Sequence, residues 1–170
     1  MFRLFLLSTL QLARAGPIDR VLVDVDGQLV LASELSIEAE LVALDPSPTP
    51  FWSHRSPQDR LVDAAVIRRV AVDVALYQPS KEAVQGRLEA VRSAFASRGA
   101  WARFLTDHGL DEERLKAVLR RRIQVELFLL RNVQVSPLQA APWHAATAEL
   151  IGRLRQGVRI RAVAPGEQLE

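Results

Sequence analysis

Two carboxylates stand close together near the beginning of the chain, where an apolar run ends. Asp24 and Asp26 belong to the sequence VLVDVDGQLV, which covers residues 21–30. Runs rich in strand-forming residues on both sides predict two β-strands, and Asp-Gly is a preferred pair for the type I′ turn of a tight hairpin. Glycine accepts the positive φ of such a turn without a Cβ penalty. On this interpretation the two aspartates shape a bend.

The same segment resembles the first motif of the haloacid-dehalogenase-type phosphohydrolases, in which an apolar strand ends in Asp-x-Asp-Gly-Thr. The resemblance implies that Asp24 is a nucleophile and Asp26 a general acid/base beside Mg²⁺. However, Gln28 stands where that motif has threonine, and Ala164 stands where a second motif has serine or threonine. The family also needs alternating strands and helices, whereas the middle of this chain is helical in pattern. We therefore favour the hairpin and keep a degenerate phosphohydrolase as an alternative.

Other patterns of catalytic or metal-binding residues are missing from the sequence. It contains no cysteine, which excludes a disulfide framework, a thiol nucleophile and cysteine-ligated zinc or iron–sulfur sites. His54, His108 and His144 are too far apart for a His-x-x-x-His metal pair, and we interpret each as a surface or helix-capping residue. The sequence has neither Gly-x-Ser-x-Gly nor a glycine-rich phosphate loop. We expect no enzymatic activity, no cofactor and no metal.

The small net positive charge comes from the first 15 residues. The chain has 22 basic and 20 acidic residues, and the first 15 contain two arginines and no acidic residue, so the rest carries 20 of each sign. A body without net positive charge gives no support for nucleic-acid binding. The basic run at residues 120–122 is interpreted as a solvated helix face beside acidic neighbours, which are Glu112, Glu113 and Glu126.

Residues 1–15 (MFRLFLLSTLQLARA) have the pattern of a secretory signal peptide. One arginine comes first, a mostly apolar stretch follows, and Ala-Arg-Ala closes the segment. We expect cleavage after Ala15, export to the periplasm and a single domain over residues 16–170. The apolar stretch is too short to cross a bilayer, which takes about 20 residues, so no transmembrane span is expected after leader removal. The alternative is an amphipathic first helix of a cytosolic protein.

Caps and apolar stripes predict six helices, at about residues 33–44, 57–77, 80–99, 101–108, 111–131 and 143–155. Ser33 is expected to cap the first of them. The second has the stripe Val66, Ile67, Val70, Val74 and Tyr77. Residues 158–163 (VRIRAV) alternate apolar and arginine side chains, which predicts a strand with one exposed face. We expect a mainly α fold, in which the N-terminal hairpin and the C-terminal strand form a small antiparallel sheet, because an isolated hairpin is marginal in water.

The aromatic residues fall into two groups. Phe51 and Trp52 lie in a proline-rich loop before a helix cap, where they either pack on that helix or expose apolar surface to a partner. Trp101, Phe104 and Trp143 have helical spacing and are expected in the core. We name four of these as candidate client-binding residues: Phe51, Trp52, Trp101 and Phe104.

The order of these features resembles the N-terminal domain of SurA-type periplasmic chaperones. That domain opens with a valine-rich hairpin, a serine and an acidic residue before its first helix, as in IDRVLVDVDGQLVLASEL at residues 18–35. Later segments follow the same order, namely the helix at 57–77, the stripe after Pro79-Ser80, the unit FLTDHGLDEERLKAVL at 104–119 and a long helix ending in RNVQVS. The resemblance covers roughly residues 18–136 and rests on the series of patterns.

The resemblance implies an ATP-independent chaperone-like module that binds unfolded or outer-membrane-bound polypeptides. Relatives carry parvulin-type prolyl isomerase domains between the helical body and the last helix. The connector between Val135 and Trp143 has no room for one, so isomerase activity is not expected. A third interpretation is an envelope assembly factor that uses the same fold for one fixed partner.

Overall fold

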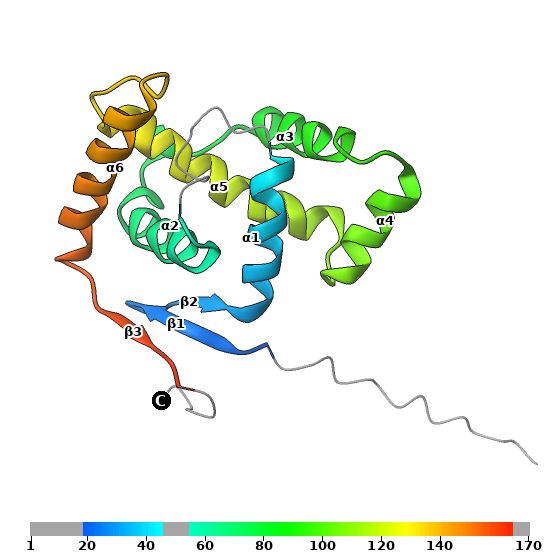
Figure 1. Cartoon of the computed structure of the whole chain (residues 1–170), viewed down its shortest axis with the longest axis horizontal. Helices are drawn as coiled ribbons and strands as arrows, with labels where there is room; N and C mark the ends of the chain where they lie inside the picture. The colour runs from blue at the N-terminus through cyan, green and yellow to red at the C-terminus, as the bar shows by residue number, and fades with distance from the viewer. Residues whose placement is uncertain (1–18, 46–54, 165–170) are drawn as a thin grey trace, which may run out of the picture.

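The computed structural model describes residues 19–45 and 55–164, and over these residues it is a helical body on a small sheet (Figure 1). The expected mainly α fold is confirmed. The elements are β1 (Val21–Val25), β2 (Gln28–Leu31), α1 (Ala32–Leu44), α2 (Pro57–Ala71), the 3₁₀ helix η2 (Ala75–Tyr77), α3 (Lys81–Ser93), α4 (Arg98–Asp107), α5 (Glu112–Asn132), α6 (Ala140–Arg155) and β3 (Ile160–Ala162). The leader, Phe51, Trp52 and His54 lie outside the described residues.

The sheet joins the two ends of the described chain. Its strand order is β2-β1-β3 and both pairings are antiparallel, with Val23 opposite Val30 on one side and Ala162 on the other. Figure 1 shows β3 returning from α6 to lie along β1. The hairpin turn has positive φ at both central residues, 50° at Asp26 and 87° at Gly27, as a type I′ turn requires. The predicted hairpin and its pairing with the C-terminal strand are both confirmed.

Helix starts follow the polar residues that the sequence places before them. Ser56, Ser80 and Asp111 each accept a hydrogen bond from the backbone N–H three residues later, over 3.1, 3.1 and 2.7 Å. Ser97 caps α4 in the same way, over 3.2 Å. This fourth cap corrects the prediction that Gly99 ends the preceding helix, because α3 already ends at Ser93 and Gly99 lies inside α4.

The limits of α1, α2 and α6 also differ from the prediction, and α6 begins at Ala140, three residues before the expected start at Trp143. The N-cap of α1 is Leu31, and Ser33 lies in the first turn with its hydroxyl bonded to Asp19. The cap function is supplied by Glu34, whose Oε2 accepts from the N–H of Leu31 over 3.2 Å. The second helix, α2, ends at Ala71, and η2 follows it as a separate short turn.

The apolar core has three parts that share helices. The sheet packs on α2, α1 packs with α3, α4 and the first half of α5, and α6 packs with α2 and the second half of α5. Because α5 is long, it contributes to two of these parts and crosses the body (Figure 1). Trp143 is fully buried, as expected. None of the helices in the described ranges is long and apolar enough to cross a membrane.

Candidate functional site

The paired aspartates of the hairpin are engaged in local structure. Asp24 is buried, its Oδ1 accepts from the N–H of Gly27 over 2.6 Å, and its Oδ2 lies 4.0 Å from Nη2 of Arg161. Asp26 forms an ion pair with Arg69, over 3.1 Å between Oδ2 and Nη1. The sheet beneath them is antiparallel, unlike the alternating strand–helix arrangement that the phosphohydrolase motif needs. No group of three or more potential metal ligands occurs among the described residues.

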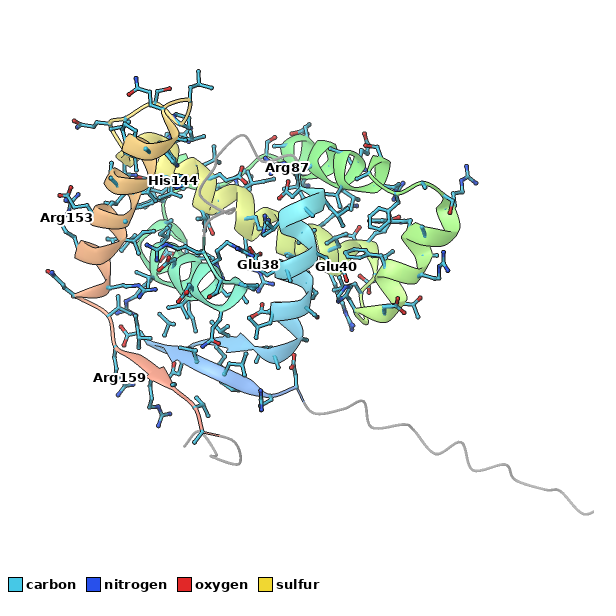
Figure 2. All side chains as sticks on the ribbon, viewed as in Figure 1. Glu38, Glu40, Arg87, His144, Arg153 and Arg159 are labelled. Carbon is cyan, nitrogen blue, oxygen red and sulfur yellow. The ribbon has the colours of Figure 1, made fainter. Side chains whose placement is uncertain are left out.

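A serine, a histidine and a glutamate meet where α4 touches α1. Nδ1 of His108 lies 3.2 Å from Oγ of Ser36, and its Nε2 lies 3.0 Å from Oε1 of Glu40. The interpretation of His108 as a helix-capping residue is confirmed, because it is the C-cap of α4, although its side chain is only 7% exposed. Figure 2 shows Glu40 on the side of α1 opposite Glu38.

This trio docks one helix on another. The hydroxyl of Ser36 donates to the carbonyl of Ser33 over 3.0 Å, so its proton is already used in a hydrogen bond to the backbone. Ser36 also lies inside α1, where the backbone N–H groups bond within the helix and cannot stabilise an oxyanion. His108 is the C-cap of α4, where a cation suits the helix dipole. We therefore assign the trio to the attachment of α4 to α1.

A chain of alternating charges runs through the interior between four helices. Arg122 of α5 binds Glu38 of α1 on one side and Asp45, the C-cap of α1, on the other. Glu38 also binds Arg60 of α2 over 2.8 Å. We call this set the buried charge chain, and its six members in order of contact are Arg60, Glu38, Arg122, Asp45, Arg87 and Glu126.

The buried charge chain is balanced, with three guanidinium groups and three carboxylates. Arg87 of α3 lies 2.7 Å from Asp45 and 2.9 Å from Glu126. Burial lowers the pKa of Arg87, but its bonds and attractions to Glu126 and Asp45 outweigh burial and raise that pKa overall. Figure 2 labels Arg87 near α3 and Glu38 beside α1. The prediction that the whole basic run at 120–122 is solvated is therefore wrong for Arg122, which is buried.

A cavity of about 60 Å³ lies between β2, α1, α2 and α5, and Glu38 and Arg122 of the buried charge chain line part of it. Most of its wall is apolar, and the apolar lining residues are Leu29, Val30, Ile37, Leu61, Ala64, Ala65 and Val118. The polar lining residues are Gln28, Glu34, Glu38, Arg68, Arg121 and Arg122. The cavity thus combines an apolar wall with a small number of charged groups, as ligand sites commonly do.

The two candidate client-binding residues that the structure describes are interior. Trp101 is 8% exposed and Phe104 is 5% exposed, and their ring centroids lie 5.8 Å apart in a stacked arrangement. Phe95 packs on both rings, and Arg92 lies over the Trp101 ring at 5.3 Å. These aromatic side chains anchor α4 to α3, so they could reach a client only after α4 moves away.

An exposed apolar segment lies where α2 ends. In residues 70–76, which we call the apolar segment, four large side chains are between 39% and 59% exposed: Val70, Val72, Val74 and Leu76. The expectation that Val70 and Val74 lie on a buried helical stripe is wrong, because Val70 is on an exposed face of the last turn of α2 and Val74 comes after the helix has ended at Ala71. The sequence signal for this end was three valines two positions apart, since β-branched residues are poor helix formers.

The backbone of the apolar segment is held in place by its neighbours. The amide of Gln78 donates to the carbonyl of Val72. The ring of Tyr77 packs edge-on against Phe128 of α5 at 5.1 Å, and its hydroxyl accepts from the Asn132 amide over 3.1 Å. The segment that carries the exposed apolar side chains is therefore anchored to α5 through Tyr77.

Sequence comparisons do not assign this chain to a family. No model of a protein family matches this sequence, and no curated protein is significantly similar to it.

Proposed function

We propose that this chain is an ATP-independent, periplasmic chaperone-like module that binds unfolded or outer-membrane-bound polypeptides. The observation that carries the proposal is the apolar segment, whose four exposed side chains lie within seven residues. Single exposed apolar residues are ordinary, but a group of them displayed together is typical of an interaction surface. The ordered sequence patterns that resemble the SurA-type N-terminal domain support the same proposal.

The chemistry of the apolar segment suits weak and unselective binding. Burial of apolar surface contributes roughly 25 cal/mol per Å² and has no directional requirement, so many client sequences can satisfy it. Asp73 within the segment and Arg69 beside it are both exposed, and they keep a polar border around the valines. Such contacts release a client by dissociation and need no nucleotide.

The test measures suppression of aggregation. A urea-unfolded β-barrel outer-membrane protein is diluted into buffer without ATP, and light scattering is followed with and without this protein. We expect suppression by the wild type and loss of most of it in the triple variant Val72→Ser/Val74→Ser/Leu76→Ser. The matched control is Leu138→Ser, because Leu138 is 94% exposed but lies alone in the connector before α6. Thermal unfolding of both variants checks that the fold is retained.

Each alternative function predicts a different experimental result. No suppression by the wild type, or equal suppression by the triple variant, would contradict the proposal. One stoichiometric partner in a pull-down, with no effect on general aggregation, would favour an envelope assembly factor. Mg²⁺-dependent phosphate release that Asp24→Asn abolishes would favour a phosphohydrolase.

A further inference from the structure

We propose that the cavity between β2, α1, α2 and α5 binds a carboxylate that carries a short apolar group. The proposal does not depend on the chaperone function, because it concerns different residues from the apolar segment. It rests on the shape of the cavity, the imbalance of charge along its wall and two buried polar atoms that lack partners.

The apolar part of the wall accounts for the tail of the ligand. The cavity has a volume of about 60 Å³, which exceeds the roughly 10–15 Å³ that a cavity needs to hold one water molecule. Side chains from the hairpin, α1, α2 and α5 line it, so a short alkyl group would meet apolar atoms from all four elements. Water gains few hydrogen bonds on such a wall, whereas an alkyl group gains contact.

The charged part of the wall accounts for the carboxylate. Arg68 and Arg121 both line the cavity, and only Glu34 opposes them, since Glu38 and Arg122 neutralise each other in the buried charge chain. Glu34 is already shared between Arg121, over 3.1 Å, and the N–H of Leu31. The wall therefore has one positive charge more than negative charges, which favours an anionic ligand.

Nε of Arg68 is a buried donor atom that lacks an acceptor. No ion pair between described residues includes Arg68. Burial lowers the pKa of Arg68, the charge of Arg121 lowers it further, and Glu34 opposes both. A carboxylate at this position would pair with the guanidinium, which is built for planar two-point contact with carboxylates.

Gln28 supplies a second unsatisfied group at the same wall. Its Oε1 is buried without a donor. Rotation of the amide about its last bond exchanges the oxygen for the –NH₂ group, so Gln28 can donate to an anion from the hairpin side. The cavity thus offers donors from both β2 and α2, and an apolar lining between them.

The test is titration of the protein with hexanoate, followed by calorimetry and by NMR shifts. For a ligand of this size we expect saturable 1:1 binding with a Kd on the order of 1 mM. Hexanol and hexylamine have the same tail, so we expect them to bind at least tenfold more weakly. No saturation, or equal affinity for hexanol, would overturn the proposal.

Two variants and one control locate the site. Arg68→Met should weaken hexanoate binding at least tenfold without lowering the unfolding temperature, because Nε has no bond to lose. Ala64→Leu should block the cavity and also abolish binding. Arg69→Met is the control, because Arg69 is exposed and pairs with Asp26 outside the cavity, and its affinity should equal that of the wild type. Wild-type affinity in Arg68→Met would contradict the assignment.

The carboxylate could belong to a free carboxylic acid or to the C-terminus of a polypeptide, and a comparison of two peptides distinguishes these sources. Acetyl-Ala-Leu with a free C-terminal carboxylate is compared with its amide. Binding of hexanoate but of neither peptide identifies a free carboxylic acid as the ligand class. Binding of the free-acid peptide, with loss in the amide, extends the class to the C-terminal residue of a polypeptide. Binding of the amide as well as the acid would contradict a carboxylate site.

Discussion

Nε of Arg122 lies 2.8 Å from Oδ2 of Asp45, across 77 positions of the sequence, and both side chains are buried. The contact fixes the C-terminal end of α1 against the middle of α5. Arg122 is the only member of the run at 120–122 that is buried, since Arg120 is exposed and Arg121 extends to Glu34 at the surface. Three adjacent arginines on one helix point in three directions, so they have three different environments.

We predict that Arg122→Met destabilises the protein by about 3–5 kcal/mol. The substitution keeps an unbranched side chain in place but leaves Glu38 and Asp45 buried with one guanidinium fewer. Urea unfolding followed by circular dichroism measures the change in the free energy of unfolding. Arg120→Met is the matched control and should change it by no more than about 0.5 kcal/mol. Equal effects of the two substitutions would show that the buried charge chain does not hold these helices.

The pH dependence of stability should contain a contribution from Asp63. This carboxyl on α2 is fully buried between Arg155, 3.0 Å away, and Arg55, 2.7 Å away. Burial raises its pKa above the usual range, although the charges of Arg155 and Arg55 oppose the rise. The folded state therefore binds this proton more tightly than the unfolded state, whose pKa is about 3.9.

It follows that the stabilisation from protonated Asp63 is complete below about pH 3.9 and is lost as the pH rises through the raised pKa. Asp63→Asn removes this titration. We predict that the wild type minus variant difference in unfolding free energy decreases as the pH rises above about 4. Urea unfolding of both proteins between about pH 4 and 7 measures that difference. A difference that increases with pH would mean that the two arginines outweigh burial.

Two glycines should respond to alanine with opposite signs. Gly27 has a φ of 87° and nothing near its missing Cβ, so Gly27→Ala suffers only backbone strain, which we expect to cost about 1–2 kcal/mol. Gly86 lies inside α3 with open space around it, so Gly86→Ala should stabilise the protein by about 0.5–1 kcal/mol. Urea unfolding measures both. Destabilisation by Gly86→Ala would contradict the helical role of that position.

The predictions that succeeded depend on residues that lie close together in the sequence. The Asp-Gly turn, the caps at Ser56, Ser80 and Asp111 and the length of α5 all depend on groups within three or four positions of each other. The pairing of β3 with β1 was also predictable, because a lone hairpin needs a third strand to be stable.

The candidate sites were less accessible to sequence reasoning. Burial of Arg122, Glu38 and His108 required partners from distant helices, and nothing in their local patterns separates them from solvated charges. Val70 and Val74 of the apolar segment were assigned to a buried stripe, and for Val74 the helical periodicity was extended across the point where α2 ends. The unsatisfied atoms of Arg68 and Gln28 line one cavity only when β2 packs beside α2.

By itself, then, the sequence determined the turn, the helix starts after Ser56, Ser80 and Asp111, and the fold class, since these follow from short-range hydrogen bonds and from the period of apolar residues. Only the tertiary structure decided which charges enter the interior, which valines remain outside and where a cavity opens. The physical reason is that burial is a property of the surfaces that meet, and those surfaces belong to segments far apart along the chain.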